Sequence, residues 1–187
     1  MSVTRRAHAK LNVFLRVLGV REDGYHDIET VILPLELHDV VTAETADGFG
    51  VSVTGPRAGE LAHAGGEALV ERAARAWAHE TGREAPGATI TVEKRIPVAA
   101  GLGGGSADAA ATIRALDQLH GTDLPTETLL GIAAAVGSDV PALLLGGPVY
   151  ADGRGDRVTP VHAQTTHWVV VPASFAVLVT VQVQSRV

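Results

Sequence analysis

The fold is decided by the stretch Ile96-Pro97-Val98-Ala99-Ala100-Gly101-Leu102-Gly103-Gly104-Gly105-Ser106-Ala107-Asp108. Its glycines remove the side chains that would keep a ligand away from the backbone, and they permit the positive φ angles of a tight loop. The residues that follow favour a helix, with Ser106 as the expected N-cap and Asp108 in the first turn. A loop of N–H groups that leads into a helix N-terminus binds anions, most often phosphate. The stretch therefore predicts a nucleotide site.

Two common phosphate-binding motifs do not fit this loop. A P-loop requires lysine directly before Ser106, where the sequence has Gly105. The dinucleotide fingerprint, counted from Gly101, requires glycine at the position of Ser106. A glycine-rich turn before a helix, without any ligand, is the alternative that the loop alone leaves open.

The loop resembles the motif P-x-x-x-G-L-[GS]-[GS]-[GS]-[SA]-[AS] of the GHMP kinases, small-molecule kinases named after galactose, homoserine, mevalonate and phosphomevalonate. The resemblance implies an α+β fold of the ribosomal protein S5 domain 2-like type, in which a mixed sheet is packed with helices. It also implies ATP and Mg²⁺ as cofactors. The residues expected to bind ATP are Pro97, Val98, Ala99, Ala100, Gly101, Leu102, Gly103, Gly104, Gly105, Ser106 and Ala107.

Periodicity predicts the elements on either side of the loop. Residues 88–96 alternate as a strand, and the helix after the loop has an inward stripe of Ala109, Ile113 and Leu116 and ends near His120. Further helices are expected over 67–81 and 125–136, and a hairpin over 147–161. Strand, loop and helix in this order are the context that a phosphate-binding loop requires.

The N-terminal segment alternates strictly from Ala7 to Val17, which predicts a half-buried strand. Lys10 and Asn12 then share the face opposite the aliphatic one. Spacing alone allows a solvated outer face for both residues. Tyr25 and His26 follow at a loop-to-strand junction, where they could simply anchor a hairpin.

The segment Ala9 to Leu15, taken with Gly24-Tyr25-His26, resembles one branch of the GHMP kinases. That branch phosphorylates the 2-hydroxyl of a cytidine diphosphate-linked methylerythritol in the non-mevalonate isoprenoid pathway. The resemblance implies that Tyr25 and His26 form a cytosine pocket and that Asn12 orients the polyol of this small-molecule substrate.

A third block is Gly137-Ser138-Asp139-Val140-Pro141, an acid before an apolar segment. Ordinary capping, with Ser138 as the N-cap, accounts for the pattern by itself. The block resembles the third motif of the same kinases, which implies that Asp139 is the general base. Lys10 beside it would stabilise the carboxylate charge and the alkoxide that forms.

Composition limits the other classes of function. The chain has 187 residues, 46% hydrophobic and 19% charged, and its net charge of −6 disfavours non-specific binding to nucleic acid or to an anionic membrane. It has no cysteine, and its histidines lack the spacing of metal ligands, so no protein-held metal is expected. The first residues lack the apolar core of a signal peptide, and a cytoplasmic location is expected.

The resemblance divides the chain in two. Residues 1–171 are expected to form the N-terminal ATP-binding domain, and residues 172–187 an atypical tail without the C-terminal GHMP domain. The tail lacks the glycine-rich continuation of these kinases, and Phe175 does not match their second cytosine-stacking aromatic. A truncated chain of weak or absent activity is therefore expected. Another GHMP kinase or a non-catalytic nucleotide-binding protein are the alternatives, and the oligomeric state is left open.

Overall fold

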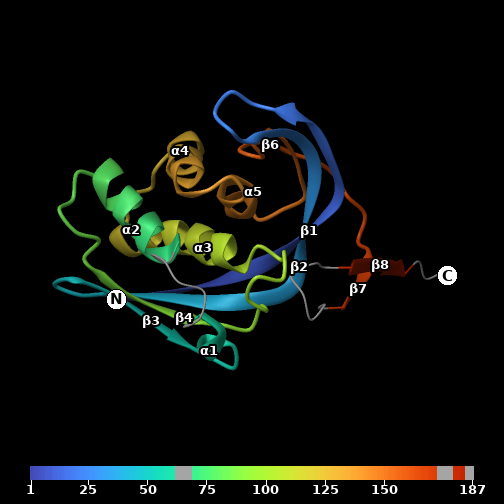
Figure 1. The fold of residues 1–187 in the computed structure, drawn as a ribbon. Coiled ribbons are helices and arrows are strands. Elements are labelled where there is room, and N and C mark those ends of the chain that lie inside the picture. Colours follow the sequence, from blue (N-terminus) through green and yellow to red (C-terminus); the bar gives the residue numbers. More distant parts are fainter. Residues whose placement is uncertain (62–68, 172–178, 184–187) are drawn as a thin grey trace.

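A computed structural model describes residues 1–61, 69–171 and 179–183 of the chain. One mixed sheet and one group of helices make up most of it (Figure 1). The main sheet contains β1 (Ser2–Val20), β2 (His26–Thr45), β3 (Phe49–Thr54), β4 (Ala88–Glu93), β5 (Val149–Gly153) and β6 (Arg157–Pro160). The helices are α1 (Ala58–Leu61), α2 (Leu69–Glu80), α3 (Gly104–His120), α4 (Thr126–Val136) and α5 (Val140–Leu145). A separate pair of strands, β7 (His167–Val171) and β8 (Val179–Val183), follows at the end.

The long strand β2 organises the sheet. Strand β1 pairs with it antiparallel over nearly its whole length, while β4 pairs with residues 40–45 of β2 and β5 with residues 28–32. Strands β3 and β4 run parallel, so the sheet is mixed. The expected α+β fold with a mixed sheet packed with helices is therefore confirmed.

The core lies between the sheet and helices α2 to α5, which gather on one side of it (Figure 1). Helix α3 is central, and its predicted stripe of Ala109, Ile113 and Leu116 is fully buried. Its many alanines allow close packing against both the sheet and α2, where Trp77 is fully buried. The predicted helix over 125–136 and the predicted hairpin are also present as α4 and β5–β6. The start of the predicted helix at Glu67 lies outside the described residues.

The predicted alternation along β1 is wrong beyond Asn12. All residues from Val13 to Val20 are exposed, including Leu15 at 56% and Val17 at 57%. Register shifts interrupt the pairing with β2 at three places, and buried β1 residues occur only from Ala7 to Leu11. Among the described residues, no core therefore covers the aliphatic side chains of the distal half, although their period is that of a half-buried strand.

Within the part of the chain that the structure describes, no helix combines the length and the apolar character needed to cross a bilayer.

Candidate active site

The glycine loop joins β4 to the N-terminus of α3, as the sequence predicts. It surrounds a cavity of about 250 Å³, which Leu69 and Lys94 line together with residues 97–106. The first N–H groups of an α-helix have no acceptor within the helix, and here they belong to Gly104, Gly105 and Ser106. The cavity and these donors fit an anion such as a nucleotide phosphate.

The prediction of Ser106 as the N-cap is wrong. Helix α3 begins at Gly104, and Gly103 is the N-cap, in the left-handed conformation with φ of 69°. The N–H of Ala107 already donates to the carbonyl of Gly103 at 2.8 Å. Glycine in this conformation allows the helix to begin before the residue that the capping preference favours. Ser106 consequently lies within the first turn, where its hydroxyl is free of a capping role.

Gly103 also lies directly against Lys10 of β1. The N–H of Lys10 donates to the carbonyl of Leu102 at 2.8 Å, so the loop is attached to β1 through the backbone. A Cβ atom added to Gly103 would lie 2.7 Å from Cγ of Lys10. The position of Lys10 and the conformation of the loop are therefore coupled.

We expect Gly103→Ala to destabilise the protein by about 1–3 kcal/mol and to weaken ATP binding. The added methyl group must both accept a positive φ and displace the Lys10 stem. Gly121→Ala is the matched control, because Gly121 has φ of 58° but no atom within 4 Å of an added Cβ. Urea unfolding and titration with an ATP analogue measure the two effects. Equal losses in both variants would show that the contact with Lys10 is unimportant.

The other end of the loop is held by α1. The N–H of Val98 donates to Oε2 of Glu60 at 3.1 Å, and Arg57 pairs with Oε1 of the same carboxylate at 2.6 Å. Hydrogen bonds from Arg57 and then Val98 lower the pKa of Glu60 below its usual value. A charged acceptor therefore anchors the loop shortly after Pro97.

Lys10, Asn12 and Asp139 come together beside the loop. The ammonium Nζ of Lys10 donates to Oδ1 of Asn12 at 2.5 Å and lies 3.4 Å from Oδ2 of Asp139. The side chain of Lys10 is only 11% exposed, whereas that of Asp139 is 36% exposed. An ammonium and an accessible carboxylate thus face each other at the edge of the site.

Asp139 itself is the N-cap residue of α5, and the expected N-cap Ser138 precedes it. The carboxylate of Asp139 nevertheless makes no capping hydrogen bond, because it is directed to Lys10. Ordinary capping therefore does not account for this acid. Its carboxylate is left available for chemistry.

Asn12 has a fixed orientation. Its Nδ2 donates to Oγ1 of Thr30 at 2.7 Å, and that hydroxyl donates to the carbonyl of Phe14 at 2.6 Å. The amide oxygen is consequently the atom that faces Lys10. The prediction that Lys10 and Asn12 share one surface is confirmed by this contact.

Tyr25 and His26 lie at the tip of the β1–β2 ribbon. Both are exposed, Tyr25 at 55%. In the β1–β2 pairing, Lys10 lies opposite Pro34 and Val20 lies opposite His26. His26 is therefore roughly 25 Å from the level of Lys10 along β2. The ribbon bends, however, and Figure 1 shows its tip on the side where α5 and β6 lie. There Arg154 of the β5–β6 turn lies over the Tyr25 ring, 5.2 Å from Cζ to the centroid.

A buried charge cluster that no pattern in the sequence predicts lies beneath the glycine loop. Lys94 is 2% exposed and donates to Oδ2 of Asp39 and, at 2.7 Å, to Oδ2 of Asp108. Asp39 also accepts the N–H groups of Arg95 at 2.5 Å and Ile96 at 2.8 Å. The cluster therefore fixes the chain as it leaves β4 and joins it to the first turns of α3.

The sequence predicts Asp108 in the first turn of α3, where its charge would favour the helix dipole. This prediction is wrong, because the carboxylate faces inward to Lys94. Burial raises the pKa of Asp108 to about 7, and Asp39 adds to this while Lys94 opposes it. Burial alone would lower the pKa of Lys94, but the two carboxylates outweigh it and raise that pKa. Two carboxylates and one ammonium hold an excess negative charge, which a proton on Asp108 neutralises.

We expect Asp108→Asn to stabilise the protein increasingly, relative to the wild type, as the pH rises from 4 to 7. The folded chain binds a proton at Asp108 more tightly than the unfolded chain does, so the stability that this group contributes is lost as the pH rises toward its folded pKa of about 7. Asparagine cannot ionise, so the variant avoids this loss. Urea unfolding at several pH values measures the difference. A constant difference between the two proteins would contradict the raised pKa.

Among the described residues, no group of three His, Cys, Asp or Glu side chains lies close enough together to hold a metal ion.

Comparison with known proteins places this site in a family. The model of the GHMP kinases N terminal domain matches residues 68–147, which include the glycine loop, α3 and Asp139. A crystal structure of a 4-(cytidine 5'-diphospho)-2C-methyl-D-erythritol kinase superposes with a TM-score of 0.69 at 38% identity, covering 90% of this chain and 57% of the other. The chain therefore contains a GHMP kinase N-terminal domain.

The curated relatives of this chain carry the name of one particular kind of kinase. The 4-diphosphocytidyl-2-C-methyl-D-erythritol kinase of Clavibacter michiganensis is 44% identical over 176 residues, which are 94% of this chain and 56% of the relative. The enzyme of the same name from Salinispora arenicola is 48% identical over 170 residues, 90% of this chain and 53% of the relative. The chain thus spans about half the length of the curated relatives that it matches.

Proposed function

We propose that the chain carries the ATP-binding half of a kinase that transfers the γ-phosphoryl group of ATP to the 2-hydroxyl of 4-diphosphocytidyl-2-C-methyl-D-erythritol. The contact that supports this most directly is that of Asp139 with Lys10, whose backbone holds the glycine loop. Residues 1–171 form the N-terminal domain of this kinase. In the 172–187 tail, Phe175 lies outside the described residues.

The roles of the residues follow from the demands of phosphoryl transfer, which needs positioning and charge stabilisation more than covalent help. The backbone from Pro97 to Ala107 binds the phosphates of ATP, and Ser106 supplies a hydroxyl to phosphate or to Mg²⁺. Mg²⁺ held on the nucleotide phosphates would neutralise part of their charge.

Asp139 then acts as the general base. Its carboxylate is accessible and makes no capping bond, so it can accept the proton of the substrate hydroxyl. Lys10, almost buried beside it, stabilises the alkoxide as the proton leaves. The amide oxygen of Asn12 orients Lys10 and the polyol. Tyr25 and His26 bind the cytosine at the tip of the ribbon.

A calorimetric titration tests the proposed ligands on the 187-residue chain. A non-hydrolysable ATP analogue is titrated first, followed by the cytidylyl substrate, homoserine, mevalonate and galactose. We expect the ATP analogue and the cytidylyl substrate to bind and the other three to fail. Binding of one of those three instead would favour another GHMP kinase, and binding of the ATP analogue alone would favour a non-catalytic nucleotide-binding protein.

A further inference from the structure

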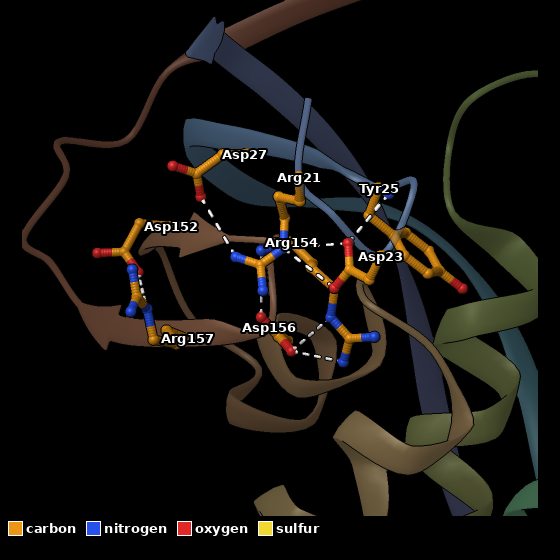
Figure 2. A network of polar contacts seen from close by, with 8 residues as sticks. All are labelled: Arg21, Asp23, Tyr25, Asp27, Asp152, Arg154, Asp156 and Arg157. Atoms are coloured by element: carbon orange, nitrogen blue, oxygen red, sulfur yellow. Dashed lines mark hydrogen bonds and ion pairs between the residues drawn. The ribbon is translucent and has the colours of Figure 1, made fainter. Parts of the chain in front are cut away.

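The β5–β6 turn, Gly153 to Asp156, carries charged residues that the proposed chemistry does not use. Figure 2 shows them facing the tip of the β1–β2 ribbon. Arg154 of this turn places its guanidinium over the ring of Tyr25, although 129 positions separate the two residues in the sequence. A cation over an aromatic face is attracted by the negative charge of that face.

The guanidinium is held in place by Asp156. Its Nε and Nη2 donate to Oδ2 of Asp156 at 3.1 and 2.8 Å, and the backbone N–H of Arg154 donates to Oδ1 at 3.3 Å. Burial would raise the pKa of Asp156, but the hydrogen bond and charge of Arg154 outweigh it and hold that pKa below its usual value. Both side chains are largely covered, at 33% and 20% exposure. The plane of Arg154 is therefore fixed before any ligand binds.

Tyr25 is held from its own side by a tight turn. Its N–H donates to Oδ1 of Asp23 at 3.1 Å, and its carbonyl accepts the N–H of Arg21 at 2.8 Å. Arg21 also pairs with Asp23 at 3.2 Å (Figure 2). The backbone of the turn is thus fixed, whereas Tyr25 as a whole residue is 55% exposed. Arg154 lies over one face of that ring.

The same turn contacts the segment that precedes Asp139. A Cβ added to Gly155, which has φ of 94°, would lie 3.9 Å from the carbonyl oxygen of Ser138 and 3.3 Å from Cδ1 of Ile28. The β5–β6 turn therefore contacts the aromatic tip of the ribbon and also lies near the backbone beside the proposed base.

We infer that Arg154 is a positioning residue that holds the Tyr25 ring as a platform for the pyrimidine of the substrate. The base stacks on the face opposite the guanidinium. This inference rests on the proposed function, because it presumes a pyrimidine ligand at Tyr25. Its effect is on the affinity for the cytidylyl substrate and not on the affinity for ATP.

Calorimetry on the 187-residue chain tests the positioning role of Arg154 with three single variants. We expect Arg154→Met to weaken binding of 4-diphosphocytidyl-2-C-methyl-D-erythritol about two- to thirtyfold, the range of a cation–π contact, while binding of the ATP analogue is unchanged. Arg154→Lys keeps a cation and should recover part of the loss. Arg157→Met is the matched control, since Arg157 pairs with Asp152 and should leave both affinities unchanged.

A double-mutant cycle with Tyr25→Ala separates positioning from a general structural role. If Arg154 acts through Tyr25, Arg154→Met adds little once the ring is absent. Undiminished substrate binding in Arg154→Met, an equal loss of ATP binding, or full additivity with Tyr25→Ala would each overturn the inference alone. Failure of the wild type to bind the cytidylyl substrate would overturn the proposed function, and this inference with it.

Discussion

Asp139→Asn is expected to lower the rate of phosphoryl transfer about 10²- to 10⁴-fold, the contribution of a positioned general base. Asparagine keeps the shape of the side chain but cannot accept the proton of the substrate hydroxyl. Folding should be nearly unaffected, because the carboxylate is 36% exposed and makes no capping hydrogen bond. The rate is measured with saturating MgATP and cytidylyl substrate, and folding by thermal unfolding.

Two companion variants sharpen this prediction. Lys10→Met should also slow the reaction, and the double variant should be little slower than either single one, because residues that act as a unit are not additive. Ser138→Ala is the control for local structure, since Ser138 precedes Asp139 and has no proposed role in the chemistry. A rate in Asp139→Asn close to that of the wild type would exclude this residue as the base.

Lys94→Met is expected to destabilise the protein by about 3–5 kcal/mol, the cost of leaving buried charge without its partner. The variant removes the ammonium shared by Asp39 and Asp108, both nearly inaccessible to solvent. Asp108 escapes part of the penalty by binding a proton. Because Asp39 also holds the backbone of Arg95 and Ile96, the glycine loop should become less ordered and ATP binding weaker.

The neighbouring Arg95→Met provides the control for Lys94→Met. Arg95 pairs with Glu93 at 2.9 Å on the surface, with both side chains about 40% exposed, and such pairs contribute about 1 kcal/mol or less. Adding Asp108→Asn to Lys94→Met should restore part of the lost stability, since it removes one of the two unpaired carboxyls. Urea unfolding measures all of these proteins. Similar losses for Lys94→Met and Arg95→Met would contradict the importance of the cluster.

Features that depend on nearby residues could be predicted from the sequence. The order of β4, glycine loop and α3 follows from periodicity and from the concentration of glycine, and both are local. The predicted inward stripe of α3 is confirmed for the same reason. Even there, the capping preferences misplace the start of α3, because Gly103 can adopt a conformation that serine rarely does. At α5, serine and aspartate are equally good caps, so local preference cannot choose between Ser138 and Asp139.

Features that depend on tertiary contacts could not be derived from spacing. No local pattern brings Lys10 next to Asp139, and the resemblance to the GHMP kinases alone suggested it. The buried cluster joins Asp39, Lys94 and Asp108 from three separate elements, and at sequence level each resembles a surface charge. One signal was present, since Asp39 directly precedes the apolar pair Val40-Val41 within an extended segment. The burial predicted from alternation along β1 was wrong, because periodicity does not tell whether another element covers the aliphatic face of the strand.

The most direct test of the central claim is to incubate the purified chain with MgATP and each of four acceptors, and to search for phosphorylated product by mass spectrometry. The acceptors are 4-diphosphocytidyl-2-C-methyl-D-erythritol, homoserine, mevalonate and galactose. The proposed site predicts slow transfer to the cytidylyl substrate alone, abolished by Asp139→Asn. Transfer to another acceptor, or transfer that survives Asp139→Asn, would contradict the claim that this chain holds the chemical site of such a kinase.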